Sequence, residues 1–239
     1  MTSSTIDESQ RKAATVVGWS YLLALPPAVF AEFYVRTRLV AFDDAAQTAR
    51  NIMAHERLFR LGSAGNLTVF AINVVLIIAL YTVLRSVNRY LALLATGWGL
   101  VETATLVVVT LSDFYLLRIL SGADYLQAFE ANRLQALARL SVSAHADVYN
   151  VGLVFAGLRS TVFCYLWFKS RLIPGTLAAW GMVASVLMGA CAFSFIIVPE
   201  LKTVIPIGIY GGPIFLFELT MGLWLLLKGL RPSSAEELA

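Results

Sequence analysis

The chain has 239 residues, of which 59% are hydrophobic and only 14% are charged, and its mean hydropathy is +0.75. Soluble globular domains carry about 25% charged residues, so this composition excludes an ordinary water-soluble protein. The formal charge of +3 comes mostly from arginines beside apolar stretches, where they meet lipid headgroups. It therefore gives no reason to expect nucleic acid as a partner.

Six stretches are long and apolar enough to cross a membrane as helices, which takes about 20 residues each. Strand-like alternation is absent from them. In chain order, the predicted spans are 13–35, 59–84, 90–117, 143–168, 176–198 and 207–228. We therefore expect an all-α, integral membrane helical bundle that forms a single membrane domain over residues 1–239.

Two connections between the spans are long enough to form helices of their own. In the first, Asp43 and Asp44 precede a partly amphipathic segment that leads into the second span. In the second, Asp124 opens a segment whose apolar residues, from Leu126 to Leu137, fall near one face. We expect both segments to be amphipathic helices on the membrane surface.

An even number of spans places both termini on the same side of the membrane. The lysines and arginines of the short loops RSVNR and KSR favour cytoplasmic termini, because short cytoplasmic loops are enriched in positive charge. The first span is too long for a signal-peptide core, so we expect it to remain. The sequence thus predicts a multi-pass protein of the cell membrane.

Small residues and prolines mark the places where the spans depart from uniform helices. Gly181, Ser185 and Gly189 are spaced four apart and predict a seam of close helix packing. Pro26 and Pro27 are expected to break or kink the first span locally.

Ionisable side chains within spans are rare and costly, and they are functional candidates by default. Apart from Arg60 and Lys228 at span ends, the chain has seven: Glu32, Glu102, Asp113, His145, Asp147, Arg159 and Glu218. Counting along the spans places Glu102 and Glu218 near the midplane, and Arg159 is the one deep cation that could pair with either. Such a pair could serve helix packing instead of forming a site, and both roles stay open for Glu102 and Glu218.

Glu102 and Asp113 are eleven residues apart, about three helical turns, so they face the same side of their helix. They predict a polar track from one membrane face to the centre. Glu32 lies four residues before Arg36 and is expected to pair with it. Asp113 is expected to neutralise one of three arginines at the same face: Arg57, Arg60 or Arg118.

The fourth span has two faces of different character. One carries His145, Tyr149, Gly152, Ala156 and Arg159, with Phe155 at its edge, and the opposite face carries Asp147 and Asn150. The first face fits either a cavity or a close helix contact.

The chain contains no phosphate-binding glycine-rich loop, no metalloprotease motif and no histidine cluster, so we expect neither a metal site nor a cofactor.

Seven segments carry a family resemblance: FAEFYVRTRL, ERLFRLG, YTVLRSVNRYLALLATGWGLVETA, LSGADYLQAF, AHADVYNVGLVFAGL, LIPGTLAAWG and FELTMGLWLLLKGL. Together they resemble the bacterial membrane family described as domain of unknown function 4386, over nearly the whole chain. The resemblance implies a six-helix bundle and supplies no activity or catalytic set.

The leading functional hypothesis is an intramembrane enzyme of the cyclase, lyase or isomerase type, acting on a lipophilic, isoprenoid-like substrate. Proton-initiated terpenoid cyclisation needs an acid, an apolar cavity and aromatic faces that stabilise cations. Glu102 or Glu218 would be the acid, because a carboxyl group away from water keeps its proton more readily. Asp147 is the third candidate catalytic residue. The candidate cavity aromatics are Trp98, Tyr149, Phe155, Phe215 and Trp224.

Two alternatives explain the same residues. In a proton- or cation-linked carrier, the carboxylates would bind the transported ion. In a non-catalytic partner or sensor protein, the glycine seams and aromatic residues would serve packing alone. For each of these functions we expect lipophilic small molecules or membrane lipids as partners, and the oligomeric state stays open.

Overall fold

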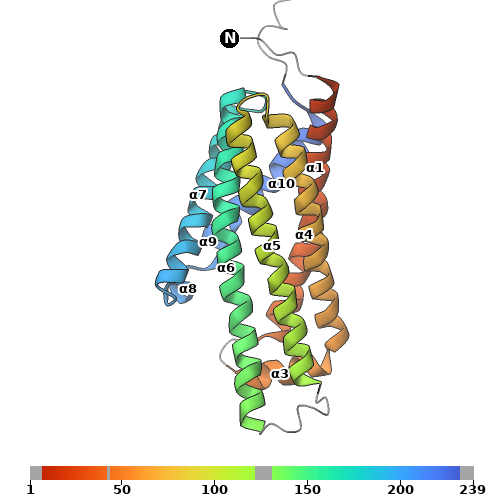
Figure 1. Cartoon of the computed structure of the whole chain (residues 1–239), viewed down its shortest axis with the longest axis vertical. Coiled ribbons are helices and arrows are strands. Elements are labelled where there is room, and N and C mark those ends of the chain that lie inside the picture. Colours follow the sequence, from red (N-terminus) through yellow and green to blue (C-terminus); the bar gives the residue numbers. More distant parts are fainter. Residues whose placement is uncertain (1–6, 42–43, 122–130, 232–239) are drawn as a thin grey trace, which may run out of the picture. The chain divides into compact units, whose positions relative to one another are not determined.

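The structure is a computed structural model that describes residues 7–41, 44–121 and 131–231, and its regular secondary structure there is entirely helical (Figure 1). Six segments in this part of the chain are long and apolar enough to cross a membrane: Glu8–Leu39, Glu56–Leu84, Arg89–Leu120, Leu137–Ser170, Gly175–Ile197 and Ile207–Leu227. The prediction of an all-α protein with six spans is confirmed, and the chain is a multi-pass membrane protein.

The first span changes its helical pitch directly after two prolines. Helix α1 (Glu8–Ala28) contains Pro26 and Pro27, and a π-helix, η1 (Val29–Arg36), follows it. A proline has no N–H group, so the carbonyl four residues earlier loses its usual partner. The prolines were expected to break or kink the span, but the chain stays helical by adopting π geometry, in which hydrogen bonds join residues five apart. The short α2 (Thr37–Leu39) completes the span.

The first connection forms the expected helix, α3 (Ala45–Ala54). The Asp44 carboxylate caps it by accepting a 2.8 Å hydrogen bond from the backbone N–H of Gln47. Helices α4 (Glu56–Leu84) and α5 (Arg89–Leu120) then form the second and third spans.

The second connection differs from the expectation of a separate surface helix. Its beginning, including Asp124, lies outside the described residues, and its later part belongs to α6 (Ala131–Ser170), a single helix of 40 residues. No proline or glycine separates Ala131 from the apolar span, so nothing in this part of the sequence ends the helix. Helices α7 (Gly175–Ile197), α8 (Leu201–Val204), α9 (Ile207–Tyr210) and α10 (Gly212–Leu227) complete the chain.

The chain divides into two compact units. Unit 1 comprises Met1–Leu23, Ile72–Thr103 and Asn150–Ala239, and unit 2 comprises Ala24–Ala71 and Ala104–Tyr149. Helices α1, α4, α5 and α6 contribute residues to both units. The single membrane domain stays a prediction.

Each unit has its own core. In unit 1, apolar side chains from five helices are almost completely buried: Val17, Leu80, Trp167, Ala178 and Phe217. In unit 2, the buried side chains come from η1, α2, α3, α4, α5 and α6: Val35, Leu39, Ile52, Phe59, Leu116 and Ala138. Between helices in lipid, such contacts stabilise mainly through close van der Waals packing.

Helices α6 and α7 of unit 1 approach each other closely at two glycines. A Cβ atom added to Gly157 would lie 2.6 Å from the Cα of Gly189 and 3.0 Å from the carbonyl oxygen of Ser185. Ser185 is completely buried and donates a hydrogen bond to the carbonyl of Gly181 on its own helix. The predicted packing seam over Gly181, Ser185 and Gly189 is confirmed.

Substituting Gly157→Ala should therefore destabilise unit 1, because the clash is with backbone atoms that cannot rotate away. We expect a loss of about 1–3 kcal/mol, as for other overpacked cores. The matched control is Gly97→Ala on α5, whose Cβ would meet nothing within 4 Å and should leave stability unchanged or slightly raised. Thermal unfolding of the purified proteins in detergent measures both. Equal melting temperatures for the two variants would contradict the seam.

Candidate functional site

The buried ionisable side chains of the spans gather in two networks, one within each unit. In unit 1, Glu102 and Arg159 are each 5% exposed, and in unit 2, Asp113 and His145 are 6% and 4% exposed. A buried charge is costly unless it is paired and hydrogen-bonded, so the partners of each group decide what it can do.

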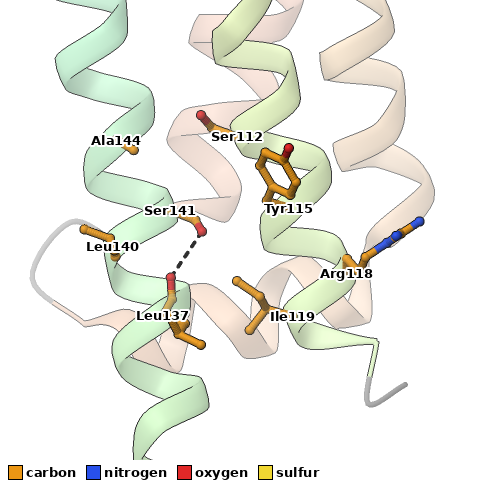
Figure 2. A pocket seen from close by; sticks show the side chains of 8 residues that line it. All are labelled: Ser112, Tyr115, Arg118, Ile119, Leu137, Leu140, Ser141 and Ala144. Carbon is orange, nitrogen blue, oxygen red and sulfur yellow. Dashed lines mark hydrogen bonds between the residues drawn. The ribbon is translucent and has the colours of Figure 1, made fainter. Parts of the chain in front are cut away.

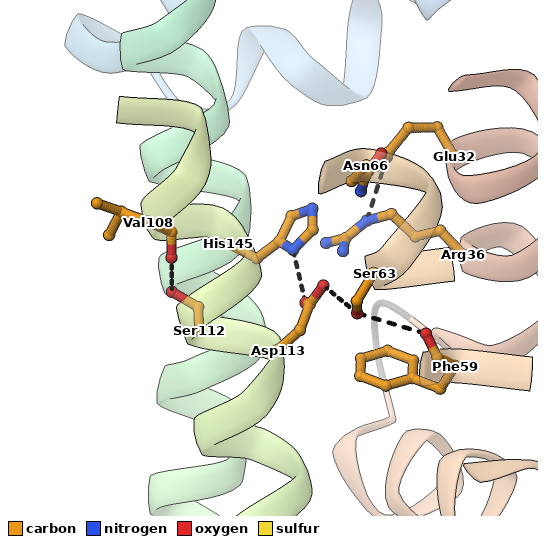
Figure 3. A network of polar contacts seen from close by, with 9 residues as sticks. All are labelled: Glu32, Arg36, Phe59, Ser63, Asn66, Val108, Ser112, Asp113 and His145. Atoms are coloured by element: carbon orange, nitrogen blue, oxygen red, sulfur yellow. Dashed lines mark hydrogen bonds and ion pairs between the residues drawn. The ribbon is translucent and has the colours of Figure 1, made fainter. Parts of the chain in front are cut away.

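In unit 2, the Asp113 carboxylate on α5 joins two other helices (Figure 3). Its Oδ1 lies 2.9 Å from Nδ1 of His145 on α6, and its Oδ2 accepts a 3.0 Å hydrogen bond from the hydroxyl of Ser63 on α4. Both carboxylate oxygens therefore have a polar partner, and an ionised Asp113 would accept at both. Asp113 was expected to neutralise Arg57, Arg60 or Arg118, and this expectation is wrong.

His145 is held by one ring nitrogen and leaves the other open. An ionised Asp113 can only accept at Nδ1, and with that partner a neutral imidazole carries its proton on Nδ1 and leaves Nε2 as an acceptor. Nε2 is buried and has no hydrogen-bond partner among the described residues. Tyr149, one turn further along α6, stacks on the His145 ring with centroids 6.4 Å apart. The imidazole is thus fixed in place with a basic nitrogen available.

The π-helix η1 brings a charged pair to the same place. Asn66 on α4 donates a 3.0 Å hydrogen bond to Glu32, and Arg36 lies 4.0 Å from the other oxygen of Glu32. This confirms the expected pair of Glu32 with Arg36. The Arg36 guanidinium points toward His145 and Asp113 (Figure 3). Short π-helical segments occur frequently at functional sites.

A small cavity of about 20 Å³ is lined by these side chains, among them Glu32, Arg36, Ser63, Asp113 and His145. A water molecule needs about 10–15 Å³ and two to four polar partners. The cavity therefore has room for about one water, beside an open imidazole nitrogen and a fixed cation. Such a group of residues can accept a proton and stabilise a negative charge that develops nearby.

In unit 1, the Glu102 carboxylate on α5 forms an ion pair with the guanidinium of Arg159 on α6. Nε of Arg159 lies 2.6 Å from Oε2 of Glu102; the two atoms form an ion pair, but their geometry is not that of a hydrogen bond. Nη2 of Arg159 donates a 3.3 Å hydrogen bond to Oε1 of Glu102. Asn73 on α4 donates to the same Oε1 and to the hydroxyl of Thr103. Arg159 thus pairs with Glu102, one of its two expected partners, and a catalytic role for Glu102 stays a prediction.

Glu218 on α10 is half-buried and interacts electrostatically with Arg159 and Glu102. It makes no hydrogen bond with any residue that the structure describes. Glu218 is therefore a carboxyl group of unit 1 that is not closed by a direct ion pair.

The other expected site residues differ in their burial and surroundings. Asp147 is exposed on α6, and Asn150 is buried in unit 1. Among the expected cavity aromatics, Trp98 and Phe155 are half-buried and Phe215 is exposed. Trp224 lies under the guanidinium of Arg231, 5.3 Å from ring centroid to Cζ. None of these six side chains lines the cavity at His145.

Four residues of the networks were not predicted from the sequence: Ser63, Asn66, Asn73 and Thr103. The available signal was the spacing of Ser63, Asn66 and Asn73 along one apolar span. Polar residues three and seven apart share one face of a helix. No group of three or more metal-binding side chains forms within the described residues.

Breaking the Glu102–Arg159 pair should be costly, because Glu102→Gln leaves a buried guanidinium without its countercharge. We expect a loss of about 3–5 kcal/mol. The double variant Glu102→Leu/Arg159→Met, which removes both charges, should recover most of this loss. The control is Glu56→Gln, which breaks the exposed Glu56–Arg60 pair and should cost less than about 1 kcal/mol. Thermal unfolding in detergent measures these differences, and a neutral Glu102→Gln would contradict the structural role.

Comparison with known families matches residues 16–229 to one family, which agrees with the resemblance seen in the sequence. Comparisons with curated proteins and with solved structures found no match. The matched range, residues 16–229, contains the residues of both networks. The chain belongs to the family described as Domain of unknown function (DUF4386).

Proposed function

We propose that this protein is an intramembrane enzyme that acts on a lipophilic small molecule by general acid–base catalysis at His145. The observation that carries the proposal is the open, buried Nε2 of an imidazole whose Nδ1 is held by Asp113 at 2.9 Å. A base needs a fixed orientation and a free lone pair, and this arrangement supplies both.

Each residue of the site has a separate role in the proposed reaction. Nε2 of His145 accepts a proton from a bound water molecule or from the substrate, and later returns it to the product. The Asp113 carboxylate holds the reactive tautomer and stabilises the imidazolium that forms, as an aspartate does beside a catalytic histidine. Arg36 stabilises the negative charge that appears when the proton leaves. Protons and charges balance over one cycle without a further reactant.

The substrate class follows from the location of the site. His145 and Asp113 lie within membrane-spanning segments, and the exposed side chains of these helices are largely apolar. Lipophilic molecules concentrate in the bilayer around these helices, and this supports them as the substrate class. The site is expected in the cell membrane, with both termini cytoplasmic as the short-loop charges favour.

A second candidate is the proton-initiated cyclisation of an isoprenoid, with Glu218 as the acid. The observation in its favour is that Glu218 has no direct ion pair, whereas Glu102 is closed by Arg159. A carboxyl group that donates a proton must be free of such a pair. Glu218 is accordingly the better candidate of the two.

The decisive variant is His145→Asn, because an asparagine amide can still donate to Asp113 from near the position of Nδ1 but offers no base at Nε2. We expect it to lower the rate of product formation about 10²–10⁴-fold, the usual contribution of a general base. Wild type and variant are expressed in a host that makes isoprenoids and phospholipids, and total lipid extracts are compared by mass spectrometry at equal membrane abundance.

The matched control is His55→Asn, which changes the only other histidine. His55 is exposed, and its Nδ1 lies 3.2 Å from the backbone carbonyl oxygen of Asn51, so its ring too has a contact at Nδ1. Its extract should equal that of the wild type. A product lost in Glu218→Gln but kept in His145→Asn would favour the cyclase instead. Identical extracts from the wild type and His145→Asn would contradict catalysis at His145.

A further inference from the structure

Unit 2 has a second, larger hollow between α5 and α6, with a volume of about 390 Å³ (Figure 2). Small-molecule sites commonly measure about 300–1,000 Å³, so its size is that of a ligand site. Leu137, Leu140 and Ala144 line it from α6 at helical spacing, which makes it about 10 Å long along the helix. This hollow, hereafter the α5–α6 groove, has the elongated form that suits a hydrocarbon chain.

The middle of the α5–α6 groove offers few free hydrogen-bond donors. The hydroxyl of Ser112 donates to the carbonyl of Val108, and that of Ser141 donates to the carbonyl of Leu137 (Figure 2). Both hydroxyl hydrogens are thus used within their own helices. The groove therefore offers mainly apolar contacts, and the Tyr115 hydroxyl is a further polar group of its lining.

Positive charge gathers at one end of the groove. Arg118 lines it from the last turn of α5, and Arg133, in the first turn of α6, lies four residues before Leu137 and so on the same face. Both arginines are exposed, and neither forms an ion pair with an acidic residue that the structure describes. Both belong to the helix ends where the spans finish, the depth at which lipid headgroups lie.

We propose that the α5–α6 groove binds an anionic membrane lipid, with its phosphate at Arg118 and Arg133 and one acyl chain along Leu137, Leu140 and Ala144. An arginine guanidinium matches the geometry of phosphate oxygens and can hold two of them at once. Basic pockets between spanning helices select anionic headgroups for this reason. Binding here does not depend on the proton transfer proposed for His145.

The test is native mass spectrometry of the full-length protein in detergent, titrated with phosphatidylglycerol or with phosphatidylcholine of the same acyl chains. The wild type should bind phosphatidylglycerol more tightly. Each of Arg118→Gln and Arg133→Gln should weaken this binding about fivefold, which corresponds to about 1 kcal/mol per arginine near a headgroup. Ala144→Phe fills the groove and should weaken the binding of both lipids.

Arg57→Gln is the matched control, since Arg57 is an exposed arginine of unit 2 that lines neither the groove nor the cavity at His145. It should bind phosphatidylglycerol as the wild type does. Both groove arginines are exposed, so their variants should keep the fold, and a thermal unfolding scan checks this. Equal affinity for the two lipids in the wild type, or unchanged phosphatidylglycerol binding in the Arg118→Gln/Arg133→Gln double variant, would overturn the proposal. The proposal would also be overturned if the lipid-free wild type formed dimers and Ala144→Phe dissociated them, because a second copy of the chain would then occupy the groove.

Discussion

The structure depends on a constraint that the membrane imposes: ionisable side chains inside apolar helices must find their partners within the protein. The two units meet this constraint differently. In unit 1, the charges of Glu102 and Arg159 neutralise each other, and neighbouring polar groups complete the pair. In unit 2, Asp113 has partners at both oxygens, whereas the His145 ring has one at Nδ1 and none described at Nε2. A closed pair serves stability, and an open nitrogen beside a water-sized cavity is available for chemistry.

The π-helix η1 links the sequence to this open site. Two prolines remove hydrogen-bond donors from the first span, and the helix changes pitch within the next few residues. Glu32 and Arg36 both lie in the π segment and both line the cavity at His145. These two side chains also need partners within the protein. Glu32 has two, because Asn66 donates a hydrogen bond to it and the Arg36 guanidinium pairs with it. An irregular helix thus places a cation where a developing negative charge would need it.

The sequence predicted the features that depend on composition and on neighbours along one helix. The spans follow from apolar length, the cap of α3 follows from Asp44, and the Glu32–Arg36 pair follows from a four-residue spacing. Contacts between helices were harder, because they depend on how each helix is rotated about its axis. Arg159 was a foreseeable partner of Glu102, since it is the one deep cation. The partner of Asp113 was not foreseen. Arg60, one of its expected partners, pairs with Glu56, and His145 is the residue that contacts Asp113. The uninterrupted α6 was missed although no proline or glycine separates Ala131 from the span, and Pro26 and Pro27 marked an irregular helix without specifying π geometry.

The central claim is that Asp113 holds His145 in the tautomer that leaves Nε2 open. The protein has two histidines, so ¹⁵N labelling of histidine gives two pairs of ring-nitrogen signals, and His55→Asn assigns the remaining pair to Nδ1 and Nε2 of His145. Nuclear magnetic resonance of the labelled protein in detergent then reports which ring nitrogen carries the proton. We predict a proton on Nδ1 and a bare Nε2 in the wild type, with this preference reduced in Asp113→Asn. A proton on Nε2 of the wild-type protein, with a bare Nδ1, would contradict the proposed site.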